Sequence, residues 1–344
     1  MTLQQLLGID LPIIQAPMAG VQGSELAIAV SNAGGVGSLP CAMLSADALR
    51  KEAEAIQSQT DRPFNFNFFA HDAPDNDEAA QQRWREQLSP YYAELDIDPD
   101  NVPAGPARTP FNKEMAEIVK EIRPAVVSFH FGLPAKDLLE MVREAGSKII
   151  SSATTVEEAI WLEGNGVDAI IAQGVEAGGH RGMFLTDNLE TQTSTFALLQ
   201  QIINAVDLPV IAAGGIVDAS CVNKAIKLGA AGVQVGTAYL LCLEAKTSAI
   251  HRAALKSEES KVTVLTNVFS GRPARGIVNR LIKEQGPISC YAPQFPLATA
   301  AVAPLRFKAE SLGSGDFTPL WSGTDTSGCR EIPAADLTRA LFGL

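Results

Sequence analysis

Two histidines stand at points of the sequence where a polar side chain follows a short apolar run. His130 ends the run AVVSFH, and His180 lies in the segment 174–182, where four glycines surround one histidine and one arginine. Such a segment is predicted to be a flexible loop that lets the backbone approach a ligand closely. Histidine changes its charge nearest neutral pH, which suits general acid–base catalysis. We therefore predict that His180 and His130 are catalytic.

The other two histidines, His71 and His251, have no such placement, and we expect them to lie on the surface. Glu176 and His180 are four residues apart, but the glycines between them oppose a helix and few other ligands stand nearby. The five cysteines are scattered and form no C-x-x-C pair. We therefore predict that the chain has no metal site.

Glycines also mark the ends of two later apolar runs. Gly214 and Gly215 follow the run LPVIAA, and the run AGVQVG ends at Gly236, directly before Thr237. Gly-rich turns expose backbone N–H groups, and a helix that begins at Thr237 would add its positive end. We predict that these two turns hold a phosphate group chiefly by backbone atoms.

Three side-chain amides stand at further run ends: Asn67, Gln173 and Gln234. A buried carboxamide needs hydrogen-bond partners, and it can both donate and accept. It therefore suits the edge of a flat heterocycle or a phosphate. Together with apolar walls and the phosphate-binding turns, these amides suggest that the ligand is flavin mononucleotide (FMN).

Eight short runs, rich in β-branched or aromatic residues, predict strands that are buried on both faces. They cover residues 12–16, 35–39, 63–68, 125–130, 148–152, 168–173, 208–213 and 231–236. Segments with apolar residues at three- and four-residue spacing predict helices between the strands. They cover residues 24–33, 45–57, 112–121, 134–145, 155–165, 195–205 and 218–228. Ser24, Thr155 and Asp218 are the expected start signals of three of these helices.

Eight strands that are mostly followed by helices predict an α/β fold, a (β/α)8 TIM barrel. The alternative is a doubly wound parallel sheet, which six strands would suit better and whose G-x-G-x-x-G fingerprint is absent. In a barrel the functional residues lie at the C-terminal ends of the strands. The histidines, amides and glycine turns all follow predicted strands, so the barrel would bring them together.

Two regions depart from the repeating unit of strand and helix. Residues 71–111 form a polar insertion with an amphipathic stretch at 77–95. We predict that residues 1–240 form the FMN-binding barrel and that 241–344 form an added C-terminal helical and loop region, with a helix at 244–256. We expect this region to pack at the barrel mouth, where it could close the substrate site.

The composition excludes several classes of function. The chain has 344 residues and 27 Lys and Arg against 39 Asp and Glu, a net charge of −12 that argues against nucleic-acid binding. No apolar stretch reaches the length of a membrane span, and the first residues lack the features of a signal peptide. The five cysteines are odd in number and scattered, which favours a reducing, cytoplasmic location.

Seven blocks of the sequence, in this order, resemble those of the nitronate monooxygenases of class I, formerly called 2-nitropropane dioxygenases. They are QAPMAG (15–20), SNAGGVGSL (31–39), SFHFG (128–132), EAGGHRG (176–182), AAGGI (212–216), QVGTA (234–238) and GRPARG (271–276). The EAGGHRG block is the most specific. The QAPM and AGGI blocks also occur more widely, including in flavin-dependent enoyl-acyl-carrier-protein reductases.

The resemblance implies an FMN-containing (β/α)8 barrel with an added domain. It implies that the chain oxidises alkyl nitronates, such as propionate-3-nitronate, with O₂ to carbonyl compounds and nitrite, without a nicotinamide cofactor. His180 would be the catalytic residue near the flavin, with His130 beside it. The cofactor-binding residues would be Pro17, Met18, Ala19, Asn67, Gln173, Gly178, Gly179, Gly214, Gly215, Gln234, Val235, Gly236 and Thr237.

One stretch departs from the family pattern. Better-studied bacterial members carry tyrosines and a lysine at the substrate entrance, and residues 291–299 correspond to part of that region. Phe295 stands in place of one tyrosine, whereas Thr299 and Ala303 do not match. The resemblance thus leaves open the physiological substrate and the use of neutral nitroalkanes. The sequence also leaves the oligomeric state open.

Two other functions fit the same barrel. One is an NAD(P)H-dependent flavin enoyl reductase, and the other is a non-catalytic flavin-binding barrel that acts as a sensor. The two histidines at the predicted barrel mouth argue against the sensor. Reduction of the flavin by NADPH without oxygen would distinguish the reductase from the monooxygenase.

Overall fold

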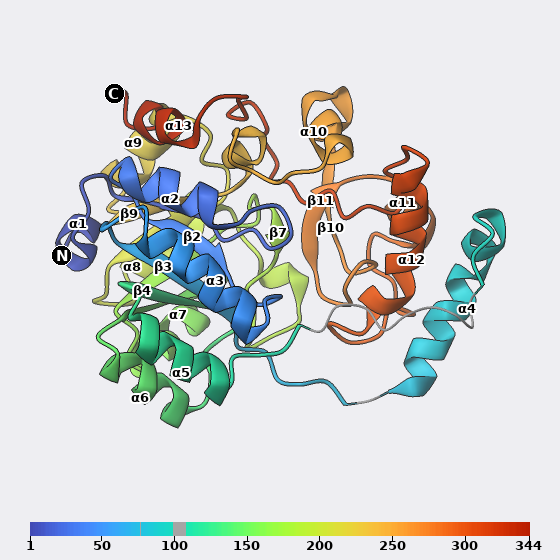
Figure 1. Ribbon diagram of the computed structural model, residues 1–344, viewed down its shortest axis with the longest axis horizontal. Coiled ribbons are helices and arrows are strands. Elements are labelled where there is room, and N and C mark those ends of the chain that lie inside the picture. The colour runs from blue at the N-terminus through green and yellow to red at the C-terminus, as the bar shows by residue number, and fades with distance from the viewer. Residues whose placement is uncertain (76, 99–107) are drawn as a thin grey trace.

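The computed structural model describes residues 1–75, 77–98 and 108–344, and its central element is a parallel barrel (Figure 1). Its eight strands are neighbours in the cyclic order β1-β2-β3-β4-β5-β6-β8-β9. Backbone hydrogen bonds from Val36 N to Ile13 O and from Gln15 N to Val36 O, both 2.9 Å, join β1 to the chain before β2 and close the ring. The strands are β1 (Ile13–Gln15), β2 (Gly37–Pro40), β3 (Phe64–Phe69), β4 (Val126–His130), β5 (Lys148–Ala153), β6 (Ala169–Gln173), β8 (Val210–Ala213) and β9 (Gly232–Val235).

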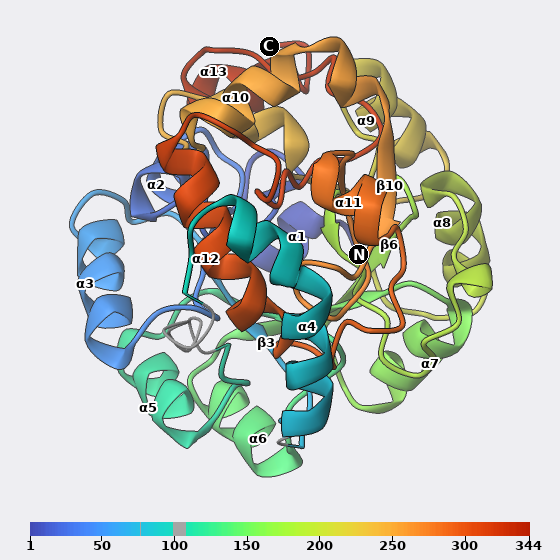
Figure 2. The same cartoon turned by 90° about the vertical axis from the view of Figure 1, so that its right-hand side faces the viewer.

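The predicted (β/α)8 barrel is therefore confirmed, and the doubly wound sheet is wrong. Helices surround the strands on the outside (Figure 2). They are α2 (Ser24–Asn32), α3 (Ala46–Gln57), α5 (Lys113–Ile122), α6 (Lys136–Glu144), α7 (Val156–Gly164), α8 (Thr195–Ile203) and α9 (Ala219–Lys227). Each matches a predicted helix. The prediction succeeds because one face of each helix packs against the barrel, and this face gives the apolar spacing in the sequence.

Two of the three expected helix starts are correct. The side chains of Thr155 and Asp218 accept hydrogen bonds from the N–H groups of Glu158 and Cys221, as N-caps do. Ser24 was expected to play the same part, but it is the first residue of α2 and the cap is Gly23. Its N–H instead donates to the carboxylate of Glu52 at 2.7 Å, a partner that local sequence does not reveal.

The N-terminal end of the barrel is closed by α1 (Leu3–Leu7), a helix outside those predicted. Leu3 and Leu7 are buried in one apolar cluster with Ile14, Ile150 and other residues that line the interior of the barrel. Because this end is filled, the C-terminal end of the strands is left as the place for a ligand site.

A small antiparallel sheet stands over that C-terminal end. It has the order β10 (Thr263–Thr266), β11 (Ala274–Ile277) and β7 (Gly179–His180), so a two-residue strand from the barrel loop after β6 pairs with a strand almost a hundred residues later. The α-helices of the C-terminal region are α10 (Ala249–Lys256), α11 (Arg280–Gln285), α12 (Ala298–Ser311) and α13 (Ala334–Ala340). The helix predicted at 244–256 thus begins only at Ala249.

The insertion after β3 carries α4 (Glu78–Glu94), which covers the amphipathic stretch predicted at 77–95. This helix lies beside α12, away from the barrel helices (Figures 1 and 2). Trp84 and Leu88 are buried in one apolar cluster with Leu305, and the hydroxyl of Tyr92 donates to Ala301 O at 2.5 Å. Residues 76 and 99–107 of the insertion lie outside the described residues.

No helix in the described part of the chain has the length and the apolar character that a membrane crossing requires.

Candidate active site

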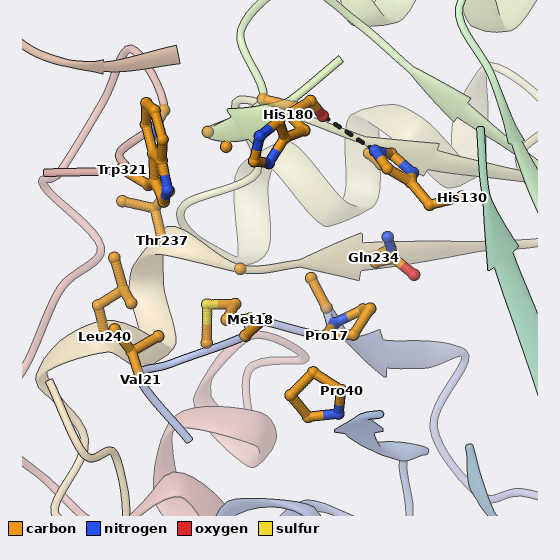
Figure 3. Close-up of a pocket in the computed structure, with 18 of the residues that line it drawn as sticks. Pro17, Met18, Val21, Pro40, His130, His180, Gln234, Thr237, Leu240 and Trp321 are labelled. Atoms are coloured by element: carbon orange, nitrogen blue, oxygen red, sulfur yellow. Dashed lines mark hydrogen bonds between the residues drawn. The ribbon is translucent and has the colours of Figure 1, made fainter. Parts of the chain in front are cut away.

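A cavity opens between the C-terminal strand ends and the small sheet (Figure 3). His180 and Trp321 lie across it from Pro17, Met18 and Gln234. Both predicted catalytic histidines and every predicted cofactor-binding residue line this one cavity. These residues are Pro17, Met18, Ala19, Asn67, His130, Gln173, Gly178, Gly179, His180, Gly214, Gly215, Gln234, Val235, Gly236 and Thr237.

His180 is held in the cavity by strand pairing. It lies opposite Ala274 in the register of β7 with β11, and Gly179 before it has a φ of 72°, which a glycine adopts without strain. The Nε2 atom of His180 is 2.9 Å from the Ser270 hydroxyl. Neither the hydrogen bonds nor the buried unpaired atoms of the described residues include Nδ1, so this nitrogen is the one open to the cavity.

The surroundings of His180 favour the neutral imidazole. Burial, followed by the positive charges of Arg108 and other cations nearby, lowers the pKa of His180 well below its usual value. Aromatic rings surround it, with ring centroids at 5.4 Å for Phe295 and 5.6 Å for Trp321. A neutral imidazole can accept a proton or a hydrogen bond at its unprotonated nitrogen, and the burial and cations that keep it neutral also weaken it as a base.

His130 stands at the end of β4, and its ring points at the main chain of His180. Its Nε2 is 3.1 Å from the carbonyl oxygen of His180, and its Nδ1 is 3.1 Å from the hydroxyl of Ser152. Burial lowers the pKa of His130 to about 4, so this ring is also neutral at neutral pH.

The segment 174–182, predicted to be a flexible loop, is anchored from within. The guanidinium of Arg181 is fully buried and donates to the carbonyls of Gln173 and Gly174 at 2.6 and 2.7 Å. The carboxylate of Glu176 accepts hydrogen bonds from both the N–H and the hydroxyl of Thr195 at 2.8 Å. The buried Arg181 and the partly buried Glu176 therefore restrict the mobility that the glycines alone would allow.

The three amides differ in what they leave for a ligand. Gln173 uses both ends, since Nε2 donates to His180 O at 3.0 Å and Oε1 accepts from Gly182 N at 2.7 Å. Asn67 donates to the Ser128 hydroxyl at 2.9 Å. The Oε1 atom of Gln234 is buried and has no hydrogen-bond partner among the described residues. Its Nε2 makes no hydrogen bond among the described residues and is not one of the buried unpaired atoms, so the amide nitrogen is the end of Gln234 that is open to the cavity.

The glycine turns form a cradle of backbone. Gly214 and Gly215 have φ values of 113° and 65°, and a Cβ on Gly214 would lie 2.8 Å from Ala177 N. Among the hydrogen bonds of the described residues, none uses the backbone N–H of Gly215, Gly236 or Thr237 as donor. An anion placed here would meet free N–H donors.

Several residues of the cavity were missed by sequence reasoning. Arg108 and Trp321 line it, and nothing near either marked them. Ser270, which bonds His180 from outside the lining, directly precedes the GRPARG block, and that block was a local signal. Of the stretch that departs from the family pattern, Phe295 packs on His180, and Thr299 lies behind Arg108, accepting from its Nη1 at 2.6 Å.

The placement expected for the two other histidines is wrong, because both are buried. His71 is packed among Phe69, Phe131 and Phe295, with the Phe295 ring centroid at 4.9 Å. His251 on α10 has its Nε2 at 3.1 Å from Trp321 O. Elements distant in sequence cover both rings, which local polarity could not reveal. Among the described residues, no cluster of three or more His, Cys, Asp or Glu side chains could hold a metal ion.

A closed (β/α)8 barrel with a partly buried histidine, a backbone cradle and an amide open to the cavity at its C-terminal strand ends defines the class of barrel enzymes with a cofactor-sized site. Comparison with known proteins narrows the class. The model of the nitronate monooxygenase family matches residues 1–343. The chain belongs to this family, and it is an oxidoreductase.

The similarity extends over whole chains. A nitronate monooxygenase from Pseudomonas aeruginosa is 40% identical over 98% of this chain and 97% of its own length. A second, from Paraburkholderia phytofirmans, is 40% identical over 98% of this chain and 92% of its own. The solved nitroalkane oxidase from Streptomyces ansochromogenes superimposes with a TM-score of 0.89 at 36% identity, covering 98% of this chain and 96% of that one.

Proposed function

We propose that this protein oxidises alkyl nitronates, with propionate-3-nitronate as one example, by means of FMN and O₂, releasing a carbonyl compound and nitrite. The observation that carries the proposal is His180, a neutral imidazole whose Nδ1 is open to a cavity lined by the family's motifs. Relatives named nitronate monooxygenase and nitroalkane oxidase support the same substrate class.

The residues of the cavity fit FMN. The amide of Gln234 would hydrogen-bond the edge of the flavin ring, and Pro17, Met18 and Ala19 would line the ring. The turns at Gly214–Gly215 and Gly236–Thr237 would hold the phosphate by backbone N–H groups. Bound FMN supplies the transfer of electrons from the substrate to O₂, which no amino-acid side chain provides.

The chain's own residues supply a place for an anion and a base. Arg108 lines the cavity, and no ion pair among the described residues includes Arg108, Arg181 or Arg272. In a chain with a net charge of −12, Arg108 in the lining favours binding of an anionic nitronate at this point, and Arg181 and Arg272, whose charges act on His130, add positive potential from behind the lining. His180 would take the proton from the α-carbon when the substrate is a neutral nitroalkane.

The test is a visible spectrum of the purified protein, followed by addition of propionate-3-nitronate in air and measurement of nitrite. We expect a flavin spectrum and nitrite release. Anaerobic reduction separates the alternatives: bleaching by nitronate supports the proposal, whereas rapid bleaching by NADPH supports an enoyl reductase. Bound flavin without nitrite from any nitronate would indicate a non-catalytic barrel, and a protein that cannot take up FMN would overturn the proposal.

We also propose that the protein works in the reducing cytoplasm, since all five of its cysteines are unpaired. Its partners are then the small-molecule nitronate and O₂, with no nucleic acid or membrane.

A further inference from the structure

The two ring nitrogens of His130 are both engaged by protein groups. A carbonyl oxygen can only accept, so His130 Nε2 must carry the proton that it donates to His180 O at 3.1 Å. If the ring is neutral, Nδ1 is then an acceptor, and the Ser152 hydroxyl at 3.1 Å is its donor. This pattern defines a single tautomer of a neutral ring and leaves neither nitrogen for a substrate.

The groups around His130 oppose a second proton on it. The ring lies against the rings of Phe131 and Phe69, at centroid distances of 4.6 and 6.1 Å. The charged groups that act on it are Arg272 and Arg181, both positive. Burial and these two cations therefore disfavour the imidazolium, in agreement with the hydrogen-bond pattern.

The carbonyl of His180 has a second donor. Gln173, at the end of β6, donates its Nε2 to the same oxygen at 3.0 Å and accepts from Gly182 N at 2.7 Å. Two barrel strands, β4 and β6, thus hold one main-chain atom of the residue that lies in the cavity. Because β7 is only two residues long, strand pairing alone leaves the His180 main chain weakly fixed.

Close packing holds the His130 ring from the other side. A Cβ on Gly182 would lie 2.8 Å from His130 Cε1 and 2.9 Å from Ser152 Cβ, so only glycine lets the loop approach this closely. The ring, the Ser152 hydroxyl and the loop backbone therefore form one tightly packed contact. Movement of the ring would move the loop that carries His180.

We propose that His130 is a positioning residue and not a proton-transfer group: as a neutral ring with the proton on Nε2, it fixes the main chain of His180. The inference rests on the proposed function for its effect on turnover, but the tautomer and the fixed loop are properties of the protein alone. His130 thereby joins the barrel end to the histidine on the small sheet.

Two substitutions of similar size test this role. In His130→Gln, the side-chain amide N–H stands about as far along the chain as imidazole Nε2 and can still donate to His180 O. In His130→Asn the amide reaches only the position of Nδ1, so the donor to His180 is lost. Ser152→Ala removes the hydroxyl that holds Nδ1 and leaves the Nε2–H donor in place.

With a neutral nitroalkane as substrate, whose α-proton His180 would take, we expect His130→Asn to lower kcat by about 10²-fold, since a misplaced catalytic group costs about that much. KM, FMN content and the pH dependence of kcat should stay near those of the wild type. His130→Gln should recover most of the lost kcat, and Ser152→Ala should resemble it. Wild-type kcat in His130→Asn, or an equal loss in His130→Gln together with an altered pH profile, would overturn the positioning role.

Two measurements without turnover keep this inference separate from the proposed function. In ¹⁵N-histidine NMR, the ring signal lost in His130→Gln should report a neutral Nε2–H tautomer from pH 5.5 to 8. Hydrogen exchange of segment 174–182 should be faster in His130→Asn than in His130→Gln. Titration of that signal within this range, or equal exchange in the two variants, would overturn the inference even if nitronate oxidation is confirmed. If the wild type releases no nitrite, the proposed function fails and these two measurements still decide the role of His130.

Discussion

The two sides of the cavity are built in different ways. The barrel side consists of strand-end turns, in which Pro17, Gly215 and Gln234 stand directly after or within short strands. The outer side consists of β7 paired with β11, together with Ser270 and Trp321 from distant parts of the chain. The side that would hold the cofactor is built from turns that each follow a strand, so each turn can be recognised from its own short segment. The side that would act on the substrate is assembled only by contacts between segments that are far apart in the chain.

The substitution His180→Asn gives the largest expected effect and tests the division between the two sides. If the outer side does chemistry, kcat/KM for a neutral nitroalkane, whose α-proton His180 would take, should fall by about 10²- to 10⁴-fold, the usual range for a positioned proton-transfer group. FMN should stay bound, because the barrel side is unchanged. Nitrite release and the visible spectrum measure the two effects in one sample.

The control is His71→Asn, the same substitution at a buried histidine outside the cavity lining, which should keep most of the turnover. Wild-type-like turnover in a His180→Asn variant that still binds FMN would contradict the catalytic role.

The stability of the protein should fall as the pH falls below about 6.5. Burial lowers the pKa of His71, His130 and His251 to about 4, so below 6.5 the unfolded chain binds protons that the folded chain does not. This stability is complete above 6.5 and is lost progressively toward pH 4. In His71→Phe the free energy of unfolding should fall by about 2 kcal/mol less at low pH than in the wild type, because Phe suits the surrounding rings and does not titrate.

Urea unfolding at pH 7 and at pH 5 measures this slope. His251→Phe is the matched variant, since it also removes a titrating ring but loses the bond to Trp321 O. It should flatten the slope while lowering the stability at pH 7. An unchanged slope in both variants would show that these rings are not held neutral.

The substitution Gln234→Leu should change the free and FMN-bound proteins in opposite directions. Among the described residues Oε1 of Gln234 has no partner, so without FMN its removal should stabilise the fold by about 1 kcal/mol. FMN should bind about tenfold to a hundredfold more weakly, since a hydrogen bond is lost. Urea unfolding without FMN and a fluorescence titration with FMN measure the two effects.

Gln173→Leu provides the contrast, because both ends of that amide are bonded to protein groups. It should destabilise the protein without FMN. If both substitutions change the free energy of unfolding in the same direction, the proposed difference between the Gln234 and Gln173 amides is wrong.

The smallest effect is expected far from the cavity, where α4 packs on α12. Tyr92→Phe removes the hydroxyl bond to Ala301 O and should lower the free energy of unfolding by about 1 kcal/mol. Turnover per folded molecule should not change, which urea unfolding and the nitrite assay check together. A loss of turnover at unchanged stability would show that this packing reaches the outer side of the cavity.

Much of the fold could be predicted because each barrel unit is a local pattern. The apolar runs and helical spacings located eight strands and seven barrel helices, since each element buries a face within its own segment. The small sheet could not be predicted, because Gly179–His180 becomes a strand only by pairing with Ala274–Arg275. The burial of His71 and His251 could not be predicted for the same reason, because residues remote in sequence cover both rings.

The sequence by itself determined the barrel and the set of residues at its strand ends, because strand direction places every such residue at the same edge. Only the tertiary structure decided what those residues can do. It paired both ring nitrogens of His130, left Nδ1 of His180 open and left Oε1 of Gln234 without a partner among the described residues. Hydrogen-bond partners come from contacts across the fold, and those contacts determine the protonation and orientation of each group.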